Sequence, residues 1–213
     1  MNTHPITCPY CGFKFDAMPR RRRKCPGCDC VVCPKSTPEN RDKRLMTETE
    51  AKEAEILWGR DQQRQQAVST LSAFGLTEQA IDNQLKAGAK TDAEALKSIL
   101  LSVADSGASS HDRKMAHFQL AIEAERNGLP FLEHLACAAR YELLRHQEQG
   151  VQKVKILAAG EANSCPSCQS QNGRVFTITN ALHQMPIPCA GCTRTLCGDV
   201  PGFCRCGYVA AFD

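Results

Sequence analysis

The spacing of hydrophobic and polar positions changes twice along the chain. Residues 1–36 show almost no helical periodicity. Residues 73–150 carry apolar side chains at helical spacing, for example Ala95, Leu96, Ile99 and Leu100, and this pattern predicts a helical bundle. After Gly150 the period shortens, so we expect strands over residues 151–158, 174–178 and 207–210, and a short helix over 179–184.

The segment between these regions is unusually polar. Ser36-Thr37-Pro38-Glu39 and Thr47-Glu48-Thr49-Glu50 both predict helix starts, because a capping side chain precedes acidic residues. The apolar positions that follow are sparse, and residues 61–66 are wholly polar. A helix that is polar at mid-length is typical of a spacer, so we expect a polar linker helix over residues 37–72.

Cysteine usage adds chemistry to this outline. The 213 residues include 14 cysteines, and all except Cys137 fall in two terminal clusters, most of them as Cys-x-x-Cys pairs. No apolar stretch approaches the roughly 20 residues of a membrane helix, and the N-terminus has no secretion-type hydrophobic run. We therefore expect a cytoplasmic protein without a membrane segment, in which such pairs indicate metal thiolate sites rather than disulfides.

The N-terminal cluster has the spacing of a zinc site. Cys8-Pro9-Tyr10-Cys11 and Cys25-Pro26-Gly27-Cys28 each place two sulfurs at a tight turn, and two such turns facing each other form a tetrahedral sulfur site. The predicted ligands are Cys8, Cys11, Cys25 and Cys28. Cys30 and Cys33 are surplus: they either replace a ligand of the second pair or are free thiols.

Five consecutive cations, Arg20 to Lys24, lie between the two pairs. Residues 1–35 carry seven Lys and Arg against two Asp, whereas the middle of the chain is acidic. One hypothesis is that Arg20, Arg21, Arg22, Arg23 and Lys24 contact nucleic-acid phosphates. The alternative is a solvated turn, or a partner for the acidic middle segment. No aromatic residue interrupts the run, so base stacking has no support.

Residues 6–60 resemble the zinc ribbons of many phage and bacterial proteins. In that group, paired Cys-Pro-x-Cys turns flank an Arg/Lys-rich turn and are followed by a strand and a polar helix such as LMTETEAKEAEILW. The chain departs from the pattern after Cys28, where Asp-Cys-Val-Val-Cys replaces a strand without cysteine. The resemblance implies a ribbon fold and leaves Cys30 and Cys33 unassigned.

The C-terminal cluster offers more thiols than one site needs. Cys165-Pro166-Ser167-Cys168 is a third turn of the same form. Two sulfurs from downstream would complete a second structural zinc site, but spacing alone does not choose them. The downstream candidates are Cys189, Cys192, Cys197, Cys204 and Cys206.

The same region resembles the C-terminal domain of Mu-type phage head-morphogenesis proteins. The resemblance is carried by Cys165 and Cys168, by Asn172-Gly173-Arg174-Val175-Phe176, by Cys192-Thr193 and by Phe203-Cys204-Arg205-Cys206. It implies a small α+β domain in which the ligands are Cys165, Cys168, Cys192 and Cys204, with Cys206 as the main rival to Cys204.

A zinc deaminase is a further alternative. His146-Gln147-Glu148 and Pro188-Cys189-Ala190-Gly191-Cys192 match the signature in which His and two Cys hold zinc and Glu moves protons. However, that His should open a helix, whereas His146 lies at the end of one. The pair at Cys165 and Cys168 would also lack partners.

Together these patterns predict an α+β chain of four parts. They are a zinc ribbon (1–36), a polar linker helix (37–72), a helical bundle (73–150) and a zinc-binding α+β domain (151–213). Two structural zinc ions with four thiolates each leave no open position for substrate. We therefore expect a non-enzymatic protein of phage or mobile-element type that binds nucleic acid, or a protein partner, through its ribbon. The alternative is an assembly protein, similar to head-morphogenesis proteins, that does not bind nucleic acid.

Overall fold

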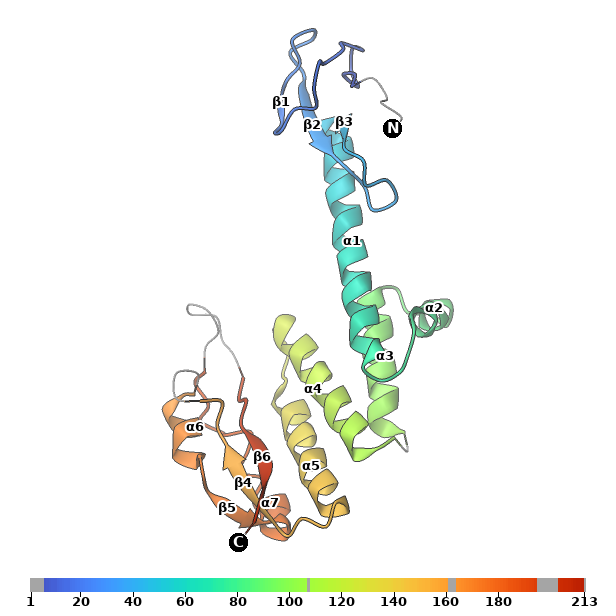
Figure 1. Cartoon of the computed structure of the whole chain (residues 1–213). Coiled ribbons are helices and arrows are strands. Elements are labelled where there is room, and N and C mark those ends of the chain that lie inside the picture. The colour runs from blue at the N-terminus through green and yellow to red at the C-terminus, as the bar shows by residue number, and fades with distance from the viewer. Residues whose placement is uncertain (1–5, 107, 161–163, 195–202, 213) are drawn as a thin grey trace. The chain divides into compact units, whose positions relative to one another are not determined.

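The computed structural model describes residues 6–212 except 107, 161–163 and 195–202 (Figure 1). The chain divides into two compact units, Met1–Ala73 and Phe74–Asp213. The first unit combines one helix, and the second several helices, with a small three-stranded sheet, which confirms the α+β class. Cys197 lies outside the described residues.

The first unit is a small sheet followed by one long helix. Its elements are β1 (Arg23–Lys24), β2 (Val31–Lys35), β3 (Arg44–Met46) and α1 (Glu48–Ser72). The strands pair antiparallel in the order β1-β2-β3, with Arg23 opposite Val32 and Cys33 opposite Met46. Figure 1 shows the sheet at the N-terminal end of α1.

The expected helix start at Ser36 is wrong. Residues 36–43 form a turn that leads from β2 to β3. The Thr37 hydroxyl accepts a hydrogen bond from the Asn40 N–H, and the Asn40 side-chain carbonyl accepts one from the Asp42 N–H. Thr and Asn side chains bond nearby backbone in turns as readily as at helix starts, so the local signal is ambiguous.

Helix α1 begins where the second signal predicts. Thr47 is its N-cap and forms a capping box with Glu50, in which each side chain bonds the backbone N–H of the other. Ala51 and Ala54 pack against β2 and β3, and the Trp58 indole N–H donates to the Ser36 carbonyl at 2.8 Å. The first part of α1 is therefore anchored to the turn after β2.

The second unit begins with helices that pack in sequence order. They are α2 (Glu78–Lys86), α3 (Asp92–Asp105), α4 (Ser110–Arg126) and α5 (Leu132–Glu148). The predicted apolar stripe on α3 is buried at Ala95, Leu96, Ile99 and Leu100. Helices α4 and α5 lie side by side (Figure 1).

The rest of the second unit is a sheet with two short helices. Its elements are β4 (Lys153–Leu157), α6 (Pro166–Gln171), β5 (Val175–Thr177), α7 (Ile178–Gln184) and β6 (Gly207–Ala211). The strands pair antiparallel in the order β5-β4-β6, and α5 and α7 pack on this sheet. Leu143, Val154, Ile156 and Ile187 form the centre of its core.

None of the described helices combines the length with the apolarity that crossing a bilayer requires.

Candidate metal centres

The first thiol site is formed by four cysteines of the first unit. Their Sγ atoms lie within 4.8 Å of one another, and we call them the ribbon cysteines: Cys8, Cys11, Cys25 and Cys28. The Cys8–Cys28 and Cys11–Cys25 Sγ distances are 3.8 and 3.7 Å. A tetrahedral zinc ion with Zn–S bonds of about 2.3 Å separates its sulfurs by about 3.8 Å. The four residues thus have the separation that one zinc ion requires.

Two tight turns orient these sulfurs. The Tyr10 N–H donates to Cys8 Sγ at 3.4 Å, and the Gly27 N–H donates to Cys25 Sγ at 3.3 Å. Burial disfavours the Cys8 thiolate, but N–H donation from Tyr10 and Cys11 together with neighbouring thiols lowers the pKa of Cys8 to about 7. The turns therefore stabilise negative charge on sulfur, as a metal thiolate site needs.

The surplus cysteines of the ribbon do not join this group. Cys33 is buried in β2, where it packs with Met46, Ala51 and Ala54 as a small apolar residue. Cys30 is half-buried, and its carbonyl accepts a hydrogen bond from the Cys25 N–H.

The second unit brings six cysteines together. We call them the C-terminal thiol cluster: Cys165, Cys168, Cys189, Cys192, Cys204 and Cys206. They form two overlapping groups in which all Sγ atoms lie within 4.8 Å. The first group is Cys168, Cys189, Cys204 and Cys206, and the second is Cys165, Cys168 and Cys192.

These groups differ from the four ligands that the head-morphogenesis resemblance implies. Cys165, Cys168 and Cys192 do lie together, but Cys204 groups with Cys189 and Cys206 instead. Pairing of β6 with β4 places Cys206, which directly precedes β6, at the edge of the core. Cys189 and Cys206 come within 3.9 Å at sulfur. This contact depends on tertiary pairing, and sequence spacing does not reveal it.

Charge in the C-terminal thiol cluster is unevenly distributed. Burial opposes ionisation of Cys165, but N–H donation from Cys168 and Thr193 and nearby thiols lower its pKa to about 6. Burial raises the pKa of Cys168, which lies between its neighbours' sulfurs. The Cys189 N–H donates to Cys204 Sγ at 3.4 Å. Thiols whose pKa burial raises, such as Cys168, ionise readily only when a cation compensates their charge.

The predicted nucleic-acid contacts form a continuous exposed segment, Arg20–Lys24, which we call the basic turn. Lys24 pairs with Asp29 at 2.8 Å, whereas within the described residues no ion pair engages the four arginines. Arg20, Arg21 and Arg22 line an open hollow of about 440 Å³ beside β2 and the first turns of α1. Lys35 and Lys52 also line it, and its acidic residues are Glu48 and Glu55.

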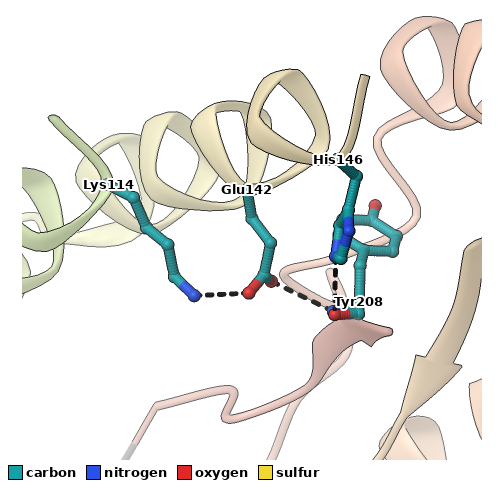
Figure 2. A network of polar contacts seen from close by, with 4 residues as sticks. All are labelled: Lys114, Glu142, His146 and Tyr208. Carbon is teal, nitrogen blue, oxygen red and sulfur yellow. Dashed lines mark hydrogen bonds and ion pairs between the residues drawn. The ribbon is translucent and has the colours of Figure 1, made fainter. Parts of the chain in front are cut away.

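The residues of the deaminase alternative do not form one site. The His146 ring nitrogen Nε2 lies 3.2 Å from the Tyr208 carbonyl oxygen, and Glu142 accepts the Tyr208 N–H at 3.0 Å and pairs with Lys114 (Figure 2). Glu148 accepts a hydrogen bond from the Ser110 hydroxyl at 2.6 Å. Neither His146 nor Glu148 belongs to a thiol group of the described residues. These side chains connect α5 to β6 and to α4 through hydrogen bonds and one ion pair.

Three cysteine groups of the described residues could therefore hold metal ions, and their all-sulfur donor sets suit zinc. Comparison with known proteins adds no relative: no protein-family model, curated protein or solved structure matches this chain.

Proposed function

We propose that this chain is a non-catalytic zinc-binding protein that binds nucleic acid through its basic turn. The observation that carries the proposal is the exposure of four consecutive arginines without acidic partners among the described residues. Arginine is the residue best suited to phosphate, because its planar guanidinium donates two parallel hydrogen bonds. The resemblance of both ends to phage zinc domains supports a phage or mobile-element origin.

The metal site gives the basic turn a defined position. The turn joins the first pair of ribbon cysteines to the second, and Arg23 pairs with Val32 in the β1–β2 ladder. Zinc would fix both ends of the turn, so the arginines lose less conformational entropy when they bind a phosphate chain.

The charge of the hollow also favours phosphate. Lys35 pairs with Glu55 at 2.9 Å, so these two charges largely cancel. Three arginines and Lys52 remain against Glu48. Because none of the lining residues is aromatic, we expect backbone contacts without base stacking and therefore weak sequence preference.

The absence of an open coordination position supports a role without catalysis. A zinc ion held by the four ribbon cysteines has no site left for water or substrate. A catalytic zinc site keeps such a position.

Binding of labelled duplex DNA, single-stranded DNA and RNA across a salt series tests the proposal. We expect affinity to fall with salt, with a log–log slope of about 0.9 per duplex phosphate contacted. Replacing Arg20, Arg21, Arg22 and Arg23 with Gln should weaken binding at low salt and flatten this slope.

A matched control removes the same charge elsewhere. The variant carries Arg60→Gln, Lys86→Gln, Lys90→Gln and Lys97→Gln, all at exposed positions outside the basic turn in the sequence. Equal weakening by both variants would show diffuse charge attraction rather than a ribbon site. No binding at about 50 mM salt would refute the proposal and favour a protein-docking role.

A further inference from the structure

The C-terminal thiol cluster has too many close thiols for one ion. A tetrahedral zinc site takes four sulfurs, but six cysteines meet here. All six are free thiols, and their Sγ contacts are far longer than the roughly 2.05 Å of a disulfide. One zinc ion, which uses all four ribbon cysteines, would therefore leave two of these six thiols without a metal.

We propose that the C-terminal thiol cluster is a binuclear metal site that holds two zinc ions and shares Cys168 and Cys204 between them. Cys168 belongs to both groups of close sulfurs, which makes it the thiolate that two ions can contact at once. The inference concerns the second unit alone and does not depend on nucleic-acid binding by the ribbon.

The sulfur–sulfur contacts follow the edges of two joined tetrahedra. Cys165 and Cys192 are 3.8 Å apart at sulfur, as the two outer ligands of one ion would be. Cys189 and Cys206 are 3.9 Å apart, as the outer ligands of the other ion would be. All of these distances are close to the edge of about 3.8 Å expected for tetrahedral zinc thiolate.

The centre of the cluster contains the two sulfurs that the ions would share. Cys168 Sγ lies 3.7 Å from Cys192 and 3.8 Å from Cys204. Two four-coordinate ions need eight ligand positions, and six thiolates supply eight only if two are shared. Cys204 is the second shared sulfur in this account, and its Sγ must move closer to Cys165 and Cys192 than it lies in the described geometry.

Burial explains why two ions suit this cluster. Cys165, Cys168, Cys189 and Cys204 are each less than a tenth exposed. One zinc ion with four thiolates carries a net charge of −2 and leaves two thiols neutral, whereas two ions with six thiolates use every sulfur at the same net charge of −2. In an apolar core the second cation lowers the cost of ionising the remaining thiols. Cys189 and Cys206 then act as ligands rather than as spare thiols.

Counting zinc in the intact chain by native mass spectrometry tests the proposal. We expect three ions per wild-type chain, one in the ribbon and two in the second unit. A Cys8→Ser/Cys11→Ser variant should keep two, because it removes the ribbon ion alone. Two ions in the wild type and one in this variant would overturn the binuclear site. Both proteins keep the wild-type second unit, so neither count depends on whether a variant of that unit folds.

Cadmium-113 NMR of the full chain tests the shared sulfur. The Cys168 β-protons should correlate with two cadmium resonances, whereas those of Cys165 and Cys206 should each correlate with one, and with different ions. Correlation of Cys168 with one resonance would contradict the bridge. Cys168→Ser should lower the zinc count by two, and Cys165→Ser by one.

Discussion

The two thiol sites of this chain are embedded in very different surroundings. Around the ribbon cysteines the buried apolar side chains are Val32 and Leu45, and two of the ligands themselves make up the rest of that core. Around the C-terminal thiol cluster the core also contains Leu143, Val154 and Ile156. We therefore expect the ribbon to depend on a bound metal for folding, whereas the second unit has an apolar core in addition.

The difference predicts two roles for the same kind of ligand. In the ribbon, a bound metal would substitute for hydrophobic burial and position a charged surface segment. In the second unit, a metal would be added to a helix-and-sheet core that already excludes water. Metal removal should therefore destabilise the first unit more than the second. Loss of buried apolar side chains should destabilise the second unit more than the first.

Metal removal gives the largest expected effect. A strong chelator should unfold the β1-β2-β3 sheet, because structural zinc contributes roughly 10–16 kcal/mol to folding in small zinc domains. Amides of β2 and β3 should then exchange hydrogen as an unfolded chain does. Amides of α3 near Leu100 and of α4 near Leu120, which are buried in the helical part, should stay protected. Hydrogen exchange followed by mass spectrometry measures protection in the sheet and in the helices. Equal loss of protection in these two regions would contradict the expected difference between the two units.

A cavity in the second unit should have the next largest effect. Leu143 is fully buried in the core shared by α5 and the sheet, so Leu143→Ala should lower the free energy of unfolding by about 2–5 kcal/mol. Leu132 lies on the same helix but is 55% exposed, so Leu132→Ala should cost far less. Denaturant titration of the metal-loaded protein compares the two variants. Equal costs would show that metal, and not packing, stabilises this unit.

The polar contacts between α5 and β6 should matter less than that core. Glu142 is 8% exposed and contacts both Lys114 and the Tyr208 N–H (Figure 2). Glu142→Gln should destabilise the second unit by about 1–3 kcal/mol, because the Lys114 charge loses its partner. The exposed Glu133 on the same helix is the control. Thermal unfolding of Glu142→Gln and Glu133→Gln at neutral pH tests this, and equal melting temperatures would contradict it.

Loss of the α1 cap should have the smallest effect. Thr47→Ala removes a capping hydrogen bond and should cost the first unit about 1 kcal/mol. Thr77 is the N-cap of α2 but makes no capping side-chain bond, so Thr77→Ala should be nearly neutral. Chemical denaturation of each variant makes the comparison, and equal costs would show that the hydroxyl bond at Thr47 contributes nothing.

The other half of the same capping box predicts a pH dependence. The Thr47 N–H donates to the Glu50 carboxylate and lowers the pKa of Glu50. This contribution is present above the ordinary carboxyl pKa and is lost as the pH falls through the lowered value. In Glu50→Gln that acid-dependent part of the stability should disappear, which denaturation at several pH values can measure.

The sequence predicted local features better than long-range ones. The α1 start at Thr47 and the buried stripe of α3 depend on neighbouring residues, and both were foreseen. The turn after Ser36 carries the same signal as a helix start, because Thr37 and Asn40 bond the backbone of a turn with the side-chain atoms that would cap a helix. The short β3 and α6 gave no periodic signal.

The thiol sites also show that the sequence predicts local features better than tertiary contacts. The ribbon cysteines come from two turns of identical form, so their spacing pointed to the four residues that lie together. In the C-terminal thiol cluster, contacts such as Cys189 with Cys206 and Cys168 with Cys204 arise where segments that are separate in the sequence meet. Several pairings are equally compatible with that spacing, and tertiary structure decides among them.

X-ray absorption at the zinc edge of the purified full chain tests the central claim most directly, namely that both units are organised by metal thiolate sites. We expect an average of four sulfur ligands per zinc at about 2.3 Å and no nitrogen or oxygen in the first coordination shell. A first shell containing nitrogen or oxygen, or a chain that retains no zinc after purification, would contradict it.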